Sequence, residues 1–395
     1  MELIYKDFPA KRISPSDGIY FYGYYDIQPF CKDLHLAHKV SFMDRVQKRG
    51  DMARVGLLDV NTSKFECLDA TEAWNFQQGA MLQWMPNSDD EIVYNCILGS
   101  EYAAVIHNIR TGHKRYLEKP VANLSPKGDY ALSINFSRLY DFRAGYGYAS
   151  IADPFYYDNH SDKDGIWLTD LKTGKSRLII SLDRIWEFCG GYFKGVDKKI
   201  VINHITFNTD GSRFLFILRD FPEPNKRHTN ALITANTDGS DMFLLSDFGM
   251  QSHYHWIDPE RVIFFSDGKE LACCRDKAHN YILKDKTYEG ELVADGFFCR
   301  DNHMSFSADR KLLLNDTYPD ANKMQHLRIA SIEKDVCVEI GSYYALINPS
   351  NSWSCDLHPC WNRDGSRISF DSTHEGIRGI YMVEVDPIRK YIDSL

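Results

Sequence analysis

The sequence predicts an all-β fold, a seven-bladed β-propeller with four-stranded antiparallel blades. The first observation is a repeated motif: a histidine, two residues, an aromatic residue, a polar turn with Asp or Gly, and a short apolar run. Its clearest copies begin at His204, His303 and His358. Each copy has the pattern of a strand, a tight turn and a second strand. A unit that recurs along a whole chain is typical of repeat architectures.

Looser copies extend this series from end to end. The residues at the aromatic position of successive copies are Phe30, Trp84, Leu124, Phe207, Trp256, Phe306 and Trp361. Between them lie hairpins of a second type, for example at residues 56–62 and 165–174. Two hairpins make one four-stranded blade, and seven blades of about 50 residues account for the chain. We therefore expect one propeller domain over residues 1–395 rather than two domains.

Two segments depart from the repeat. The interval between Leu124 and Phe207 has room for an eighth blade, but residues 138–164 are an aromatic and polar stretch. We expect an insertion at about 137–165 on the functional face, because departures from a repeat usually map to functional loops. At the N-terminus, residues 2–5 form a short strand that we predict pairs into the last blade and closes the ring.

Composition limits the possible partners. The net charge is −9 with both signs mixed along the chain, so no basic stripe indicates nucleic-acid binding. No apolar run reaches the roughly 18 residues of a membrane span, and the first residues lack a secretion-type pattern. Ten scattered cysteines, including the adjacent Cys273 and Cys274, favour reduced thiols over a disulfide framework. We expect a cytoplasmic protein that binds neither nucleic acid nor membrane.

The histidines of the repeat share one register. Three residues before the aromatic position, four consecutive blades carry His204, His253, His303 and His358, which we call the histidine arc, whereas the other three blades carry Ile27, Met81 and Val121. The innermost strand of each blade lines the channel of a propeller. The four imidazoles are therefore expected to face one another at one depth.

Imidazoles with nearby carboxylates such as Asp301 and Asp356 suit a divalent transition metal, for example Mn or Zn. Two alternatives remain open: the histidines are packing elements of the repeat, or a structural zinc site uses Cys299 or Cys360 with His303 and His358. No phosphate loop, dinucleotide fingerprint or nucleophile elbow is present, so we expect no organic cofactor and no serine-type catalysis.

These motifs resemble known families. The repeats are similar to TolB-type propellers, and residues 253–256 and 356–370 resemble the seven-bladed polysaccharide lyases of the oligogalacturonate lyase and ulvan lyase types. The likeness to the ulvan lyase type extends to residues 24–26, 79–84, 143–148 and 316–327, so it covers most of the chain.

The resemblance implies specific roles. In oligogalacturonate lyases, histidines at this register hold manganese that binds the uronate carboxylate, which makes His253, His303 and His358, with Asp356, metal candidates and His204 a ligand or catalytic group. The ulvan lyase type uses Tyr and His as acid and base and Arg against the carboxylate. The implied catalytic residues are Tyr146 or Tyr148 with Arg138 or Arg143, and the implied substrate-binding residues are Tyr25, Gln78, Gln83, His255 and Tyr318. Gln78, Gln83 and Asn95 stand where that type has histidines.

We therefore expect a lyase-like protein that performs β-elimination on uronate-containing oligosaccharides. The reaction needs a neutralised carboxylate, a base for the C5 proton and an acid for the leaving oxygen. The alternative is a non-catalytic propeller that binds carbohydrate or protein, with a structural metal or none. A metal-dependent hydrolase is the third option. One structural feature distinguishes the lyase-like enzyme from the non-catalytic propeller: the insertion either leaves the channel mouth open or plugs it.

Overall fold

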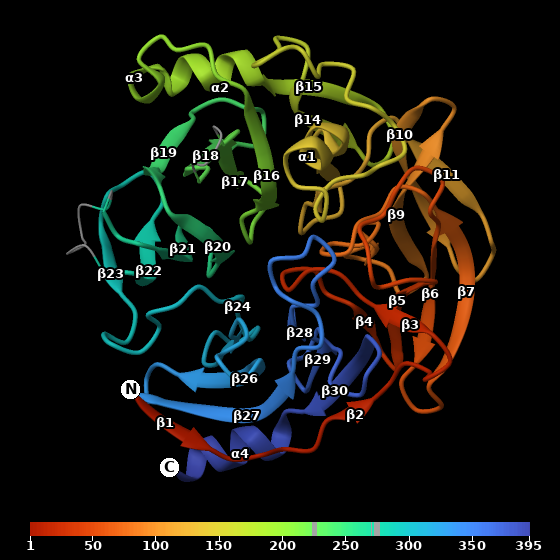
Figure 1. Cartoon of the computed structure of the whole chain (residues 1–395), viewed down its shortest axis with the longest axis vertical. Helices are drawn as coiled ribbons and strands as arrows, with labels where there is room; N and C mark the ends of the chain where they lie inside the picture. Colours follow the sequence, from red (N-terminus) through yellow and green to blue (C-terminus); the bar gives the residue numbers. More distant parts are fainter. Residues whose placement is uncertain (223–226, 270, 272–276) are drawn as a thin grey trace.

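The chain forms seven β-sheets, which are arranged in a ring around a central axis (Figure 1). The computed structural model describes residues 1–222, 227–269, 271 and 277–395, so Cys273 and Cys274 lie outside the described residues. Each sheet is one blade with four antiparallel strands, and two of the sheets carry one further strand. The predicted seven-bladed propeller is confirmed.

The first two blades precede the insertion, and the third blade contains it. Blade one contains β3 (Ile19–Phe21), β4 (Phe30–Cys31), β5 (Leu34–Val40), β6 (Ala53–Asp59) and β7 (Lys64–Thr71). Blade two contains β8 (Gln83–Trp84), β9 (Glu91–Leu98), β10 (Glu101–Asn108) and β11 (Lys114–Leu117). Blade three contains β12 (Asn123–Leu124), β13 (Tyr130–Ser133), β14 (Gly165–Asp170) and β15 (Ser176–Ser181). In blade one, β3 and β4 both pair with β5, so residues 22–29 interrupt the innermost strand.

The last four blades carry the histidine arc. Blade four contains β16 (Ile200–Phe207), β17 (Arg213–Asp220), β18 (Asn230–Asn236) and β19 (Phe243–Gly249). Blade five contains β20 (Gln251–Trp256), β21 (Arg261–Ser266), β22 (His279–Lys284) and β23 (Gly290–Leu292). Blade six contains β24 (Met304–Phe306), β25 (Leu313–Asp316), β26 (Met324–Ser331) and β27 (Val336–Tyr344). Blade seven contains β28 (Cys360–Trp361), β29 (Arg367–Ser372) and β30 (Gly379–Glu384).

N-terminal strands close the ring, as predicted, but two short strands share the task. β2 (Lys11–Arg12) pairs antiparallel with β30 and becomes the fourth strand of blade seven. β1 (Glu2–Tyr5), which we expected in the last blade, pairs parallel with β27 at the outer edge of blade six. Residues 6–10 carry the chain from one blade to the next, so two sheet edges are covered instead of one.

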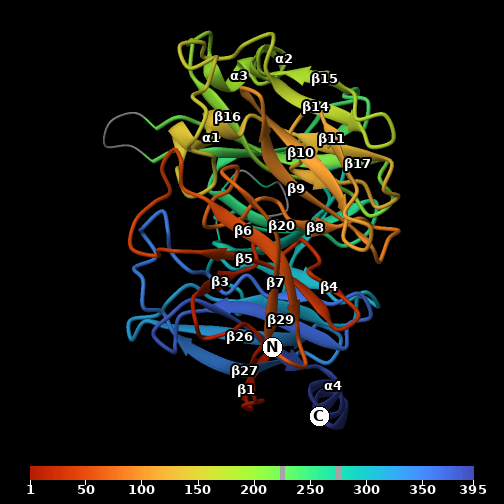
Figure 2. The same cartoon turned by 90° about the vertical axis from the view of Figure 1, so that its right-hand side faces the viewer.

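The long interval between Leu124 and Phe207 contains no eighth blade among the described residues. The part of it that departs from the repeat consists of helices and loops. α1 (Phe136–Phe142) follows β13, and its N-cap Asn135 accepts a hydrogen bond from the backbone N–H of Arg138. α2 (Leu182–Phe188) and α3 (Gly190–Phe193) lie between β15 and β16 at the rim (Figures 1 and 2). α4 (Asp386–Ser394) ends the chain beside blade six.

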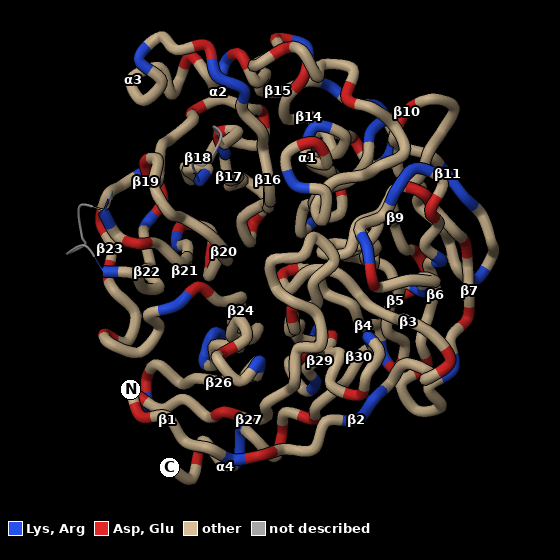
Figure 3. The backbone as a smooth tube through the Cα atoms, viewed as in Figure 1, with Lys and Arg blue, Asp and Glu red and all other residues tan. Residues whose placement is uncertain are grey.

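Neighbouring blades bury both faces of the inner strands, which explains their continuous apolar runs. Every residue of β16 and β17 is buried. The turn between them depends on Gly211, whose φ of +76° lies in the left-handed region, and on Asp210, which accepts a hydrogen bond from the backbone of Ser212. Basic and acidic residues are interspersed around the ring (Figure 3). Among the described residues, no helix has the length and apolar character that crossing a bilayer requires.

Candidate metal and substrate site

Two of the four histidines, His204 and His358, share an unusual backbone conformation. The pairing of β16 with β17 skips His204 between Asn203 and Ile205, so His204 forms a bulge with φ of +48°. His358 and Met81, at the same register of other blades, also have positive φ, 41° and 52°. Non-glycine residues in this region carry strain, and such strain is concentrated at functional sites.

The four histidines of the arc converge on the segment that interrupts blade one. The ring centroid of Tyr24, in this segment, lies 4.8 Å from that of His204 and 4.9 Å from that of His358. The His303 centroid lies 4.1 Å from His253 and 4.4 Å from His358. All four side chains are buried. The blades therefore bring the predicted arc together as one cluster around a tyrosine.

Three of the histidines are held through the same ring nitrogen. An acceptor on Nδ1 places the ring hydrogen there and leaves the Nε2 lone pair free for a metal. The three contacts are His253 Nδ1 to Asp301 Oδ1 at 2.9 Å, His303 Nδ1 to Asp316 at 3.0 Å, and His358 Nδ1 to the Gly23 carbonyl at 2.8 Å. The Nε2 atoms of His303 and His358 are buried and have no hydrogen-bond partner in the structure. Such unpaired buried groups are costly unless a ligand satisfies them.

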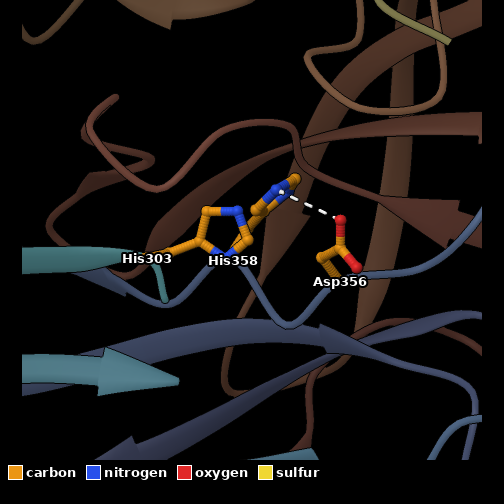
Figure 4. A group of neighbouring side chains, drawn as sticks. All are labelled: His303, Asp356 and His358. Atoms are coloured by element: carbon orange, nitrogen blue, oxygen red, sulfur yellow. Dashed lines mark ion pairs between the residues drawn. The ribbon is translucent and has the colours of Figure 1, made fainter. Parts of the chain in front are cut away.

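A candidate metal site combines two of these nitrogens with a carboxylate. Potential ligand atoms of His303, Asp356 and His358 all lie within 4.8 Å of one another. Figure 4 shows the three side chains pointing toward one another, and Asp356 Oδ2 lies 3.9 Å from His358 Nε2. Imidazole nitrogen with carboxylate oxygen is a donor set that suits Mn or Zn. The residues present therefore fit a divalent metal. His253, the fourth predicted ligand, is next to this group but outside it.

The charges around this group differ from one histidine to the next. Burial alone would lower the pKa of His303, but Asp316, Asp356 and Asp301 raise it above its ordinary value. Burial lowers the pKa of His358 far below its ordinary value, and His303 adds to this effect. Burial raises the pKa of the Asp356 carboxyl. A proton and a metal thus compete for His303, while His358 is neutral and ready to coordinate.

His204 is oriented differently from the other three. Its Nε2 contacts Asp26 Oδ2 at 2.7 Å, its ring stacks on Tyr254 at 4.4 Å, and its Nδ1 is buried without a partner. Gln78 lines a small cavity with Asp26 and His204. His255 lies within electrostatic range of the same pair, and burial lowers its pKa to about 4. His204 lies outside the candidate ligand group, and its free Nδ1 makes it a candidate for proton transfer.

The insertion brings a cation and a phenol to the cluster. The Arg143 guanidinium lies 4.4 Å from the ring centroid of Tyr146, and Arg143 reaches solvent. Tyr146 is buried with its centroid 6.3 Å from Tyr24, and burial raises the pKa of its hydroxyl. Tyr318 approaches from blade six with its centroid 5.8 Å from that of His303. Three of the predicted catalytic or substrate-binding residues, Arg143, Tyr146 and Tyr318, therefore lie beside the histidine cluster.

A second arginine near Arg143 was not predicted from the sequence. Arg219, at the end of β17, is buried, and its Nη1 donates to Asn230 Oδ1 at 2.8 Å. Burial, and secondly the charge of Arg143, lower its pKa to about 10. No carboxylate of the described residues forms an ion pair with either guanidinium. The sole sequence signal is a charged residue directly after the apolar run of residues 214–218. Two neighbouring guanidinium groups are a natural site for a carboxylate.

Arg138 and Tyr148 make structural contacts instead. Arg138 is 1% exposed, donates through Nε to the Ile200 carbonyl at 2.7 Å and through Nη1 to the Asp158 carbonyl at 3.0 Å, and pairs with Asp153. These bonds fasten the insertion to blade four. Tyr148 stacks on Phe136 with centroids 4.2 Å apart, and its hydroxyl accepts from Asn95 at 2.8 Å. Neither side chain contacts a histidine of the arc.

Two predicted substrate-binding residues also use their polar groups internally. The Tyr25 hydroxyl donates to the Tyr254 carbonyl at 2.6 Å, and Gln83 Nε2 donates to the Met81 carbonyl at 3.1 Å. Both side chains are buried.

The cysteine alternative for the metal is not supported. Cys360 Sγ donates to the carbonyls of Tyr24 and His358, Cys299 is exposed, and the ligand group found among the described residues contains no thiol. The eight described cysteines are all free, as the scattered spacing predicted.

Comparisons with known proteins agree on the fold. No protein-family model matches the chain, and none of the curated proteins matches it. A solved oligogalacturonate lyase in complex with manganese is similar with a TM-score of 0.65 and 14% identity, over 95% of this chain and 96% of that one. An oligogalacturonate lyase from Vibrio parahaemolyticus is similar with a TM-score of 0.61 and 15% identity, over 96% and 94%. The tricorn protease reaches a TM-score of 0.56 at 10% identity, over 95% of this chain but 35% of its own. At these identities the likeness establishes the propeller fold.

Proposed function

We propose that this protein is a lyase-like enzyme that performs β-elimination on uronate-containing oligosaccharides, with Mn or Zn held by His303, Asp356 and His358. The observation that carries the proposal is the pair of buried, unpartnered Nε2 atoms beside a carboxylate. The similarity to a lyase solved with manganese supports the choice of chemistry.

The bound metal would supply a positive charge against the substrate carboxylate and thereby acidify the neighbouring C–H. Arg143 and Arg219 would bind the same carboxylate or an adjacent one, because their guanidinium groups have no carboxylate partner among the described residues. His204, oriented by Asp26, or His253, oriented by Asp301, is placed to accept the C5 proton.

Tyr146 is the best candidate for the acid. Burial raises the pKa of its hydroxyl, so the hydroxyl keeps its proton at neutral pH and can donate it to the leaving oxygen. The adjacent Arg143 favours the phenolate that results from this transfer.

Access to the cluster favours an enzyme over a plugged scaffold. Tyr146 and Gly145 are tied to the segment that joins blades one and two, since the Tyr146 carbonyl accepts from Asn75 Nδ2 and the Gly145 carbonyl accepts from the Gln77 backbone. Arg143 of the same insertion remains exposed. A cavity of about 390 Å³ is lined by Asp301 and Tyr318, which contact the histidines. In this proposal the sugar ring approaches the cluster from this side, although no histidine of the arc itself lines the cavity.

Metal content and turnover test the proposal in two steps. We expect near-stoichiometric metal by elemental mass spectrometry after loading with Mn or Zn, and its loss in a His303→Ala/His358→Ala double variant. His326→Ala is the matched control, because His326 pairs with Glu339 away from the group and should leave the metal bound. Wild-type protein should then generate the ultraviolet absorbance of an unsaturated uronate from oligogalacturonate or ulvan oligosaccharides. Metal retained by the double variant would refute the site, and bound metal without turnover would favour a carbohydrate-binding propeller.

A further inference from the structure

A second cavity lies outside the histidine cluster. It has a volume of about 500 Å³ and is enclosed by blade two, blade three and the insertion. Its walls include Tyr102 from β10, Phe136 from α1, Phe155 from the insertion and Trp167 from β14. Its size and its partly aromatic lining are compatible with a small-molecule site.

One polar group in this cavity lacks a partner. Ser133, at the end of β13, is 1% exposed, and its Oγ makes no hydrogen bond. Two other buried polar groups of the lining are occupied: the carboxylate oxygens of Asp164 accept from Asn135 Nδ2 and the Gly165 N–H, and the Tyr102 hydroxyl accepts from two backbone N–H groups. Because unpaired buried hydroxyls are rare, a ligand or a bridging water that reached the Ser133 Oγ would satisfy it.

The lining of this cavity holds two lysines, Lys119 and Lys163, and two carboxylates, Glu101 and the buried, hydrogen-bonded Asp164. Lys163 is exposed, and none of the described carboxylates lies within ion-pairing distance of it. The Lys119 ammonium lies 4.8 Å from the ring centroid of Trp167 and 3.5 Å from the largely exposed Glu101. Two ammonium groups beside aromatic walls suit a ring with an anionic substituent.

We propose that this cavity binds a small ring-bearing carboxylate. The ring packs against Trp167 and Phe155, the carboxylate faces Lys163 and Lys119, and a ligand oxygen pairs with Ser133. Uronate sugars and aromatic acids share this chemistry. The site is separate from the metal group, but Ile134 and Phe136 line both this cavity and the small one that contains His204 and Asp26.

Calorimetric titration of metal-free protein tests this proposal independently of lyase activity. The probes are galacturonate and benzoate, with galactose and benzyl alcohol as their neutral counterparts. We expect saturable binding of at least one carboxylate and at least tenfold weaker binding of its neutral counterpart. The carboxylate that binds more tightly identifies the source, sugar acid or aromatic acid. Lys163→Glu should weaken its binding about tenfold or more, because a charge-assisted contact is replaced by repulsion.

Two control variants distinguish binding in this cavity from binding elsewhere on the protein. Lys127→Glu makes the same charge change at an exposed lysine outside the cavity and should leave the affinity unchanged. His303→Ala should also leave it unchanged, since binding that disappears in this variant would place the ligand in the histidine cluster and overturn the proposal. Absence of binding by both carboxylates, or unaltered affinity in both Lys163→Glu and Ser133→Ala, would overturn it as well.

Discussion

Blades four to seven and blades one to three use one backbone position for different purposes. Met81 in blade two and His204 in blade four occupy the same register and both have left-handed φ. The side chain of Met81 packs in the core, whereas the ring of His204 pairs with Asp26 in the channel. The repeat thus supplies a strained, inward-facing position in more than one blade, and the residue type alone decides where chemistry is possible.

The insertion shows the same contrast within one short segment. Arg138 is buried and binds backbone carbonyls, while Arg143 is exposed and lies over Tyr146. Tyr148 belongs to the core and Tyr146 to the site. Arg138 and Tyr148 maintain the blade, whereas Arg143 and Tyr146 lie beside Tyr24, around which the histidines gather.

The largest expected effect separates the two arginines. Arg138→Met should lower the free energy of unfolding by about 3–5 kcal/mol, because it leaves Asp153 and several carbonyls buried without their partner. Arg143→Met should change it by less than about 1 kcal/mol, since that side chain is exposed. Urea unfolding of both variants measures the difference, and equal losses would contradict the division of roles.

The next effect concerns the carboxylate behind a ligand. Asp316→Asn should weaken metal binding about 10–100-fold, because Asp316 fixes the orientation of His303 and increases its basicity. Asp320→Asn is the matched control, since Asp320 is in the following loop and pairs with His326. Competition with a chelator gives the affinities. A similar loss in both variants would indicate a general electrostatic effect instead.

Metal affinity should also depend on pH. The pKa of His303 is raised above its ordinary value, so the proton is retained to higher pH and must leave before metal binds. Affinity should therefore fall by about tenfold for each pH unit below that pKa and level off above it. In Asp316→Asn the fall should begin at lower pH, because one source of the raised pKa is removed. An affinity constant between pH 5 and pH 8 would exclude His303 as a ligand.

The smallest effect separates the two tyrosines. Tyr148→Phe should cost about 1 kcal/mol of stability, because Asn95 loses an acceptor, and should leave turnover unchanged. Tyr146→Phe should leave stability nearly unchanged and reduce turnover, if Tyr146 is the acid. Thermal unfolding and the unsaturated-product assay give both quantities. Unchanged turnover in Tyr146→Phe would shift the role to Tyr318.

The sequence was sufficient for the fold and for the arc, because both depend on a repeat whose register is visible in the residues. The sequence could not reveal which group forms the hydrogen bond that orients each histidine ring. The acceptor for His358 is the carbonyl of Gly23, 335 residues earlier in the chain, and Asp26 reaches His204 across the channel. Arg138 and Arg143 look alike in the sequence because their burial depends on the path of the insertion. Arg219 occurs once, without a repeated pattern to mark it.

The way the ring is fastened sets the order in which the site can assemble. Residues 2–5 and 11–12 pair with the outer strands of blades six and seven, and these blades supply His303, Asp356 and His358. During synthesis, the N-terminal segment is made first and has no sheet to join until the last two blades have left the ribosome. The candidate metal group therefore lies in the two blades that the N-terminal strands fasten, so closure of the ring and assembly of this group depend on the same pair of sheets.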